Sequence, residues 1–258
     1  MAAITSTRNP IIQAAKALQT KAGREQSGLF LCEGEHMVAE ALQAAPQDVV
    51  TLFVADTKAA AFAGLLSMAR SAQVYTVPEH VLAAITQVKT PQGIAATVRL
   101  PRSAALDGLG QRVLLLENVQ DPGNVGTILR TADAAGFTGC VLTPGCADAF
   151  APKTLRATMG SIFRVRIAFA ADAPAAAQAL CAMGYAVLAS LLDGDDFYAR
   201  AALPQRVCLT IGNEGAGITQ ALAQAATHRY SLPMRGGAES LNAAIAAAVF
   251  MYDLVNRS

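Results

Sequence analysis

From residue 112 to residue 225 the chain alternates between short apolar runs and segments with a helical pattern, and this alternation restricts its fold most. The first run, Arg112–Leu116, is apolar along its length, as strands are when both faces of a parallel sheet are covered. Further strand-like runs are residues 139–143, 163–168, 185–190 and 206–211. Repeated strand–helix units of this length predict a mostly parallel, doubly wound α/β sheet with its ligand site at the carboxyl ends of the strands.

The first hundred residues repeat the alternation on a smaller scale. An amphipathic pattern follows Pro10, and strand-like runs at 28–32, 49–54, 73–77 and 93–98 alternate with helical patterns at 36–42, 59–70 and 79–86. These runs predict a small α/β domain. Residues 100–110 contain a proline and two glycines and are typical of a linker. We therefore expect two domains, residues 1–105 and residues 106–258.

Composition and charge restrict the function classes. Of the 258 residues, 53% are hydrophobic and 15% are charged, which excludes a disordered chain. The formal net charge is only +1, so any binding of nucleic acid has to come from local basic patches. The N-terminal segment has an excess of basic residues, because the first acidic residue, Glu25, comes only after four basic ones: Arg8, Lys16, Lys21 and Arg24.

Cysteines and histidines do not indicate a metal site. The five cysteines are scattered without a C-x-x-C pair, and the three histidines show no ligand spacing, so we expect reduced thiols, a cytoplasmic protein and no bound metal. Residues 173–192 carry no charge, but Pro174, Gln178 and Gly184 interrupt them. They are interpreted as a helix, a turn and a buried strand instead of a membrane span. No signal peptide is expected, because the N-terminus lacks an apolar core segment.

The C-terminal stretch from Ser231 to Ile245 contains the most unusual local pattern. Gly236 and Gly237 make a loop that allows close approach to a ligand, and Ser240 stands where a helix N-cap is expected. The following segment has no charge until Asp253, which predicts a buried helix. Asn242 then lies within an apolar helix, and a buried amide needs a hydrogen-bond partner. Its partner is either the glycine loop or a ligand.

A second glycine-rich loop follows the strand at residues 206–211. Gly212, Gly215 and Gly217 give the spacing G-x-x-G-x-G, which differs from the dinucleotide-binding G-x-G-x-x-G. Glu214 inside this loop would repel a pyrophosphate, and no P-loop lysine is present. A nucleoside ligand without phosphates, and with a positive charge, suits the loop better. S-Adenosylmethionine is such a ligand.

Three blocks, taken in order, carry a family resemblance. They are residues 118–130, residues 212–218, and Leu232-Pro-Met-x-Gly followed by Ser240-Leu-Asn242. In form and order they resemble the three motifs of the SpoU/TrmH-type RNA 2′-O-ribose methyltransferases of the SPOUT superfamily. The resemblance covers nearly the whole chain. It implies a trefoil-knotted α/β domain, S-adenosylmethionine as the cofactor, and a homodimer whose active sites use both subunits.

The resemblance also assigns roles to individual positions. Considered alone, Arg130 also fits an ordinary solvated helix charge, but it matches the family's catalytic arginine. The other implied catalytic positions are Asn124, Glu214, Ser240 and Asn242, and the implied cofactor-binding positions are Ser190, Gly212, Leu232 and Leu241. One departure stands two residues after Asn242, where Ala244 replaces a serine that the family often has.

The N-terminal segment resembles the RNA-binding domain that many family members carry, through residues 5–10 and the pair Glu33-Gly34. Arg8, Lys16, Lys21 and Arg24 are the RNA contacts that we expect, although a solvated helix face explains them as well. Ribosomal RNA is the favoured substrate, and transfer RNA is the alternative. Two readings from other classes stay open at this point: a catalytically silent RNA-binding or ribosome-assembly protein, and a dehydrogenase that uses the 212–217 loop.

Overall fold

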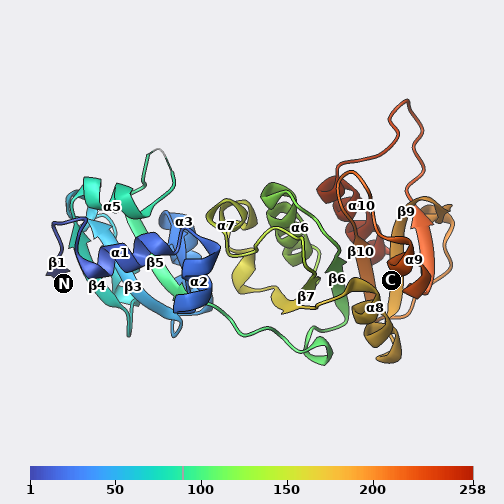
Figure 1. The fold of residues 1–258 in the computed structure, drawn as a ribbon, viewed down its shortest axis with the longest axis horizontal. Helices are drawn as coiled ribbons and strands as arrows, with labels where there is room; N and C mark the ends of the chain where they lie inside the picture. Colours follow the sequence, from blue (N-terminus) through green and yellow to red (C-terminus); the bar gives the residue numbers. More distant parts are fainter. Residues whose placement is uncertain (89, 258) are drawn as a thin grey trace. The chain divides into compact units, whose positions relative to one another are not determined.

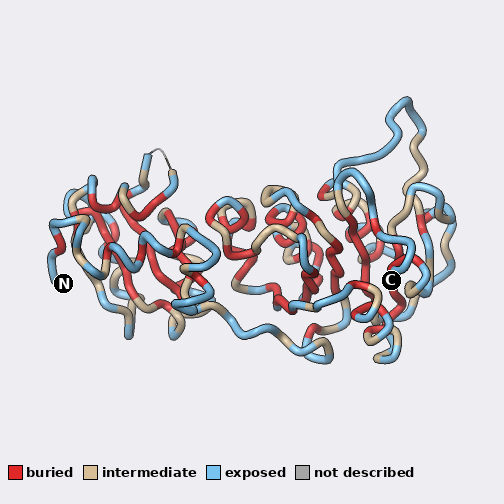
Figure 2. Tube along the Cα trace, in the orientation of Figure 1, coloured by how far each residue is buried: buried red, intermediate tan, exposed pale blue. Residues whose placement is uncertain are grey.

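The computed structural model describes residues 1–88 and 90–257, and it divides into two compact units. The first unit consists of Met1–Pro101 together with Asp148–Phe163, and the second of Arg102–Ala147 together with the chain from Arg164 onward. Each unit has buried backbone segments of its own (Figure 2). The segment Asp148–Phe163 joins the first unit although it comes from the middle of the second unit's sequence. No linear pattern in the sequence indicates this exchange.

The first unit contains a five-stranded mixed sheet (Figure 1). Its strands are β1 (Ala2–Ala3), β2 (Leu29–Glu33), β3 (Val49–Ala55), β4 (Gln73–Val77) and β5 (Ile94–Arg99), in the spatial order β1-β4-β3-β5-β2. β3 runs parallel to β4 and antiparallel to β5, which also pairs antiparallel with β2. Strands β2 to β5 follow the apolar runs of the sequence, whereas the two-residue β1 was not expected.

Helices cover both faces of this sheet. Helices α1 (Pro10–Ala17) and α5 (Glu79–Ile85) cover one face, where Ile12, Leu82 and Phe53 share a core. On the other face lie α3 (Glu35–Ala44) and α7 (Pro152–Thr158), and the ring of Phe30 contacts the rings of Phe150 and Phe163 there. The remaining helices of the unit are α2 (Lys21–Ser27) and α4 (Ala63–Met68).

The second unit contains a six-stranded sheet in which all neighbouring strands are parallel. Its strands are β6 (Arg112–Leu116), β7 (Gly139–Leu142), β8 (Arg166–Phe169), β9 (Ala186–Asp196), β10 (Val207–Ile211) and β11 (His228–Ser231), in the order β11-β9-β10-β6-β7-β8. The expected parallel α/β fold is therefore confirmed. The strand β11 was missed, because the polar sequence His-Arg-Tyr-Ser lacks an apolar run.

Two pairs of helices flank this sheet. α8 (Ala173–Ala182) packs with α9 (Gln220–Ala225), while α6 (Pro122–Ala134) packs with α10 (Ala243–Asn256). The uncharged residues 173–192 form α8, a turn at Gly184 and the start of β9, as expected. Within the described residues, no helix is long and apolar enough to cross a membrane.

The start and the burial of α10 differ from the expectation. Asn242 is the N-cap of this helix, since its side-chain Oδ1 accepts from the backbone N–H groups of Ala244 (2.9 Å) and Ile245 (3.3 Å). Ser240 lies two residues earlier in an exposed loop, so its assignment as the cap was wrong. Asparagine caps helices about as well as serine, which leaves the choice to tertiary contacts. Only one side of α10 is buried, and Ile245 and Tyr252 are exposed.

Candidate active site

The candidate site lies at the carboxyl edge of the parallel sheet in the second unit, where the neighbouring strands β11, β9, β10 and β6 end. The outer part of β9, the loops after β10 and β11, and the start of α10 line a cavity of about 340 Å³. This is the edge at which ligands of parallel α/β sheets are expected. The 232–242 loop projects from the unit and is exposed from residue 235 onward (Figures 1 and 2).

The loop after β10 closes tightly on itself. Asn213 and Gly217 exchange two backbone hydrogen bonds of 2.9 Å. A Cβ atom at Gly212 would lie 2.1 Å from the carbonyl carbon of Gly217, so only glycine fits at position 212. Oδ1 of Asn213 accepts from the N–H groups of Gly215 and Ala216, both at 3.0 Å. The loop that borders the cavity is therefore held by its own hydrogen bonds.

Glu214 projects from this loop to the N-terminal end of α6. Its carboxylate accepts from the backbone N–H groups of Gln120 (3.1 Å) and Asp121 (3.0 Å) and from Nδ2 of Asn124 (2.9 Å). Partial burial raises the pKa of Glu214, but these hydrogen bonds lower it more, so the pKa lies below its ordinary value. The carboxylate thus connects the loop after β10 to the helix after β6.

The side chains of Asn242, Asn124 and Glu214 form a directed chain of hydrogen bonds. Because Oδ1 of Asn242 caps α10, its Nδ2 is the atom that donates to Oδ1 of Asn124, at 3.0 Å. Nδ2 of Asn124 is then left to donate to Glu214, whose ionised carboxylate can only accept. This series of hydrogen bonds therefore fixes the orientations of the Asn242 and Asn124 side-chain amides. The structure brings these three predicted catalytic residues together.

A further residue of this edge was not identified from the sequence. Glu117, at the end of β6, is buried and accepts from the backbone N–H (2.6 Å) and the hydroxyl (2.8 Å) of Thr219, which is the N-cap of α9. Glu117 thus anchors the end of the 212–219 segment to β6, while Glu214 anchors the middle of this segment to α6. A charged residue directly after an apolar strand was the available signal.

The predicted cofactor-binding residues all line the cavity, namely Ser190, Gly212, Leu232 and Leu241. The hydroxyl of Ser190 donates to the carbonyl oxygen of Thr210 at 2.7 Å, which joins the ends of β9 and β10. Ser240 also lines the cavity and is exposed. Ala244 is buried and lies outside the lining residues, so a serine hydroxyl there would need a partner within the core.

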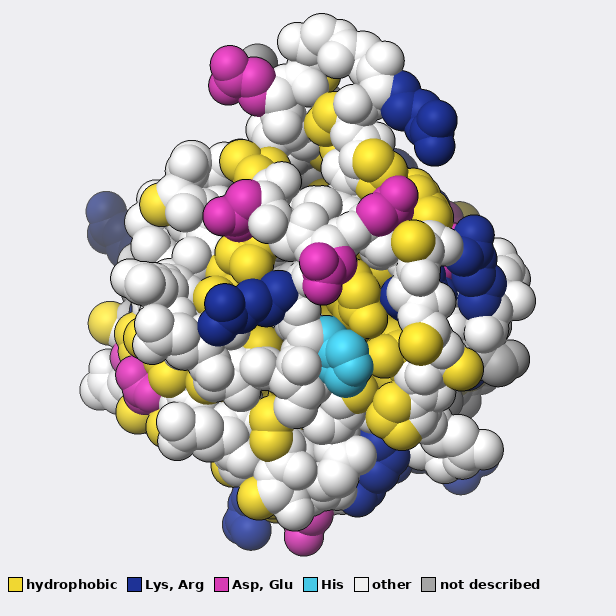
Figure 3. All heavy atoms as spheres, turned by 90° about the vertical axis from the view of Figure 1, so that its right-hand side faces the viewer, with side chains coloured by type: hydrophobic (Ala, Val, Ile, Leu, Met, Phe, Trp, Pro, Cys, Tyr) yellow, Lys and Arg dark blue, Asp and Glu magenta, His cyan; other side chains and the backbone are white. Residues whose placement is uncertain are grey.

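The charged side chains among these lining residues are acidic. They are Asp193, in the extended part of β9, and Glu214. Two carboxylates beside a cavity with apolar walls suit a cationic ligand and disfavour an anionic one. The face of the molecule drawn in Figure 3 intersperses acidic and basic side chains without a continuous basic surface. Among the described residues, no cluster of His, Cys, Asp and Glu could hold a metal ion.

Arg130 lies on α6, apart from the Asn124 side chain. Six residues along a helix correspond to about 120° of rotation around its axis, so the two side chains leave α6 in different directions. Arg130 is exposed, and its guanidinium forms no hydrogen bond or ion pair with the residues that the structure describes. Among the described residues of one chain, Arg130 therefore makes no contact with the side chains of Asn124 and Asn242.

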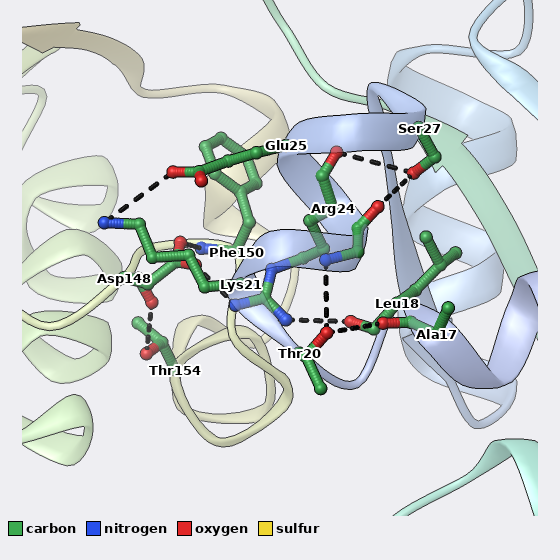
Figure 4. Close-up of polar contacts among 11 residues, drawn as sticks. Ala17, Leu18, Thr20, Lys21, Arg24, Glu25, Ser27, Asp148, Phe150 and Thr154 are labelled. Atoms are coloured by element: carbon green, nitrogen blue, oxygen red, sulfur yellow. Dashed lines mark hydrogen bonds and ion pairs between the residues drawn. The ribbon is translucent and has the colours of Figure 1, made fainter.

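The four predicted RNA contacts divide into two groups. Arg8, Lys16 and Lys21 are exposed near the first two helices of the chain. Arg24 is buried instead: its Nη1 donates to the carbonyl oxygen of Leu18 at 2.8 Å, and its Nη2 pairs with the carboxylate of Asp148 (Figure 4). Its role is therefore to fasten the 148–163 segment to the first unit, and the structure opposes its use as an RNA contact.

Comparison with known proteins places this site in a family. Residues 111–252 match the family described as "SpoU rRNA Methylase family", and residues 9–96 match the "MRM3-like substrate binding domain". The chain is a member of the SpoU rRNA methylase family. A relative in Bacillus subtilis, the 23S rRNA (guanosine(2553)-2′-O)-methyltransferase RlmP, is 38% identical over 98% of this chain and 99% of its own length.

Solved structures of this SpoU family share the fold over almost the whole chain. An rRNA methyltransferase from Sinorhizobium meliloti with bound AdoMet is 32% identical, with a TM-score of 0.84 over 98% of this chain and 97% of that one. The SpoU methyltransferase AviRb from Streptomyces viridochromogenes, in complex with the cofactor AdoMet, is 27% identical with a TM-score of 0.86 over 96% and 98%. S-Adenosylmethionine is thus the cofactor of the family, as expected.

Proposed function

We propose that this protein transfers a methyl group from S-adenosylmethionine to a ribose 2′-hydroxyl of ribosomal RNA. The observation that carries the proposal is the hydrogen-bonded chain Asn242–Asn124–Glu214 beside the cavity at the carboxyl edge of the sheet. The Bacillus subtilis relative acts, by its name, on 23S rRNA, and its likeness extends over both units. Transfer RNA is the second candidate substrate.

The lining and the charge of the cavity suit the cofactor. Ser190, Gly212, Leu232 and Leu241 would hold it, chiefly through backbone groups and apolar contact, since the Ser190 hydroxyl is bonded to Thr210. Asp193 and Glu214 give the cavity a negative charge that favours a cation. When bound, S-adenosylmethionine supplies an electrophilic methyl group on a positively charged sulfur.

Arg130 would orient the RNA. A guanidinium with a pKa above ~12 is a poor general base but a good two-pronged donor to a phosphate. We assign it to an RNA phosphate next to the reacting ribose, where it also stabilises the developing oxyanion. The proton of the 2′-hydroxyl would pass to that phosphate or to water.

The position of Arg130 favours a homodimer. Because Arg130 and Asn124 leave α6 in different directions, a complete site would combine Arg130 of one copy with Asn124 and Asn242 of another. The exposed side of α10, with Ile245 (51% exposed) and Tyr252 (47% exposed), offers apolar surface for a second copy. We further propose the family's trefoil knot for the loops that border the cavity, and a cytoplasmic location.

Calorimetric titration with S-adenosylmethionine and with NADH separates the function classes. The proposal predicts saturable binding of S-adenosylmethionine alone. Binding of NADH would revive the dehydrogenase reading, which Glu214 in the glycine loop disfavours. Binding of neither ligand, also with RNA present, would favour the catalytically silent RNA-binding protein.

A further inference from the structure

The first unit contains a cavity that the proposed methyl transfer does not use. It measures about 250 Å³ and lies between the end of β2, the start of α3, the segment before β5, and α7. Its walls include the apolar side chains of Met37, Pro91, Ile94 and Met159. Two charged side chains, Glu33 and Arg156, also line it.

Glu33 and Arg156 form an ion pair at this cavity, and the two facing atoms of the pair lack hydrogen bonds. The Glu33 side chain is 3% exposed, and its Oε1 accepts from the backbone N–H of Gln87 at 2.9 Å. Oε2 of Glu33 and Nη1 of Arg156 form an ion pair at 3.5 Å, but neither atom has a hydrogen-bond partner among the residues that the structure describes. That separation exceeds the ~2.7–2.9 Å of a charge-assisted hydrogen bond. Leaving a buried polar group unpaired costs about 1–3 kcal/mol, which a ligand's hydrogen bonds would offset.

A merely structural ion pair explains this arrangement less well. A different pair, Arg24 and Asp148, already fastens the 148–163 segment to the rest of the first unit with a direct hydrogen bond. Burial raises the pKa of Glu33, which means that the site holds the carboxylate in an unfavourable surrounding. Glu33 and Arg156 thus keep one acceptor and one donor side by side and poorly satisfied.

The charges at the cavity select the class of ligand. The Glu33 carboxylate would repel a phosphate, and the Arg156 guanidinium would repel a cation. A neutral planar group with an N–H donor next to an acceptor matches both atoms, and the apolar walls suit its faces. The Watson–Crick edge of a nucleobase has this pattern, and proteins read unpaired RNA by accepting splayed-out bases in this way.

We infer that the cavity between Glu33 and Arg156 receives one unstacked base of the RNA substrate, with Glu33 accepting from its N–H and Arg156 donating to its acceptor. This inference rests on the proposed function, since it names how the same substrate is held. Both sequence segments of the first unit contribute to the site, because Glu33 is the last residue of β2 and Arg156 lies on α7.

The test compares Glu33→Gln with Glu25→Gln in the full chain. Each removes one negative charge from the first unit, and Glu25 is an exposed control whose side chain is 65% exposed. Binding of a fluorescent random-sequence 12-nucleotide RNA is measured by anisotropy. Simple electrostatics predicts that both substitutions tighten binding. Loss of a base contact instead predicts roughly tenfold weaker binding for Glu33→Gln alone.

Melting temperature and S-adenosylmethionine affinity report whether Glu33→Gln still folds. If the folded variant binds RNA as tightly as the wild type, the inference is wrong. A second measurement needs no variant: RNA that contains 4-thiouridine is photocrosslinked to the wild type, and the modified peptides are mapped. Crosslinks to peptides with Met37 or Met159 are expected, and crosslinks confined to other regions would contradict the inference.

The test of the base-binding cavity can fail or succeed independently of the test of methyl transfer. Methyl transfer by the wild type with unchanged RNA binding by Glu33→Gln would remove the base site and leave the activity. Crosslinks in the cavity without methyl transfer would keep the base site and remove the activity.

Discussion

Nδ2 of Asn242, the N-cap of α10, donates a hydrogen bond to Oδ1 of Asn124 on α6 at 3.0 Å. One side chain therefore both starts the last helix and orients the amide that contacts Glu214. Residues 118 positions apart in the sequence meet at the candidate active site.

The Asn242→Ser substitution separates these two tasks. Serine still caps α10, so the melting temperature should change little, but it cannot donate an amide N–H to Asn124. We expect methyl transfer to fall roughly tenfold or more with near-normal folding, as for loss of one hydrogen bond that positions a catalytic group. Single-turnover rates and thermal melts provide the measurements. Activity equal to that of the wild type would exclude the Asn242–Asn124 contact from catalysis.

Glu214→Gln should lower stability in a pH-dependent way. The pKa of Glu214 is lower in the folded protein than its ordinary value, so its contribution is present above the ordinary carboxyl pKa and disappears as the pH falls through the lowered folded value. At neutral pH we expect a loss of about 1 kcal/mol, similar to the loss of a helix cap. Urea melts at neutral and acidic pH should show the difference between wild type and variant shrinking in acid. A constant difference would contradict this account.

Gly212→Ala and Gly236→Ala form a matched pair. A Cβ atom at Gly212 would overlap the backbone of Gly217, whereas nothing lies within 4 Å of one at Gly236. We expect Gly212→Ala to weaken S-adenosylmethionine binding by about tenfold or more, because the loop has to shift. Gly236→Ala should bind normally in the same titration. Equal affinities would mean that the loop after β10 does not shape the cofactor site.

The sequence predicts features that depend on local burial, and it fails to predict features that depend on residues far away along the chain. Apolar runs such as Arg112–Leu116 coincide with strands because burial on both faces selects them directly. The polar β11 is set by pairing with β9, which no local pattern reveals. The start of α10 was misplaced because Ser240 and Asn242 are both good caps. The burial of Arg24 depends on Asp148, 124 positions away.

Arg24 and Lys16 should respond differently to neutralisation. Arg24→Gln breaks a buried ion pair and should cost about 3–5 kcal/mol of stability, with the salt dependence of RNA binding unchanged. Lys16 is exposed, so Lys16→Gln should leave stability intact. It should lower the slope of log affinity against log salt by about 0.7, the value for one phosphate contact. Urea melts and RNA titrations at several salt concentrations test both. A reduced slope for Arg24→Gln would restore it as an RNA contact.

A shared active site can be tested by mixing inactive variants. Arg130→Ala and Asn242→Ser should each reduce activity, because each removes a residue that a different subunit contributes to the site. If subunits of the two variants exchange freely, half of all dimers contain one subunit of each variant, and each of these has one intact composite site, which gives about one quarter of the wild-type activity. Mixing without recovery, with exchange confirmed by native mass spectrometry, would place Arg130 and Asn242 in the same subunit's site.

The most direct measurement is transfer of labelled methyl groups from S-adenosylmethionine to ribosomal RNA, followed by mapping of 2′-O-methylated nucleotides. The wild type should modify a defined ribose, and Arg130→Ala should not while still binding S-adenosylmethionine. A label found on a base, or no transfer to ribosomal RNA by a protein that binds both ligands, would contradict the proposed function.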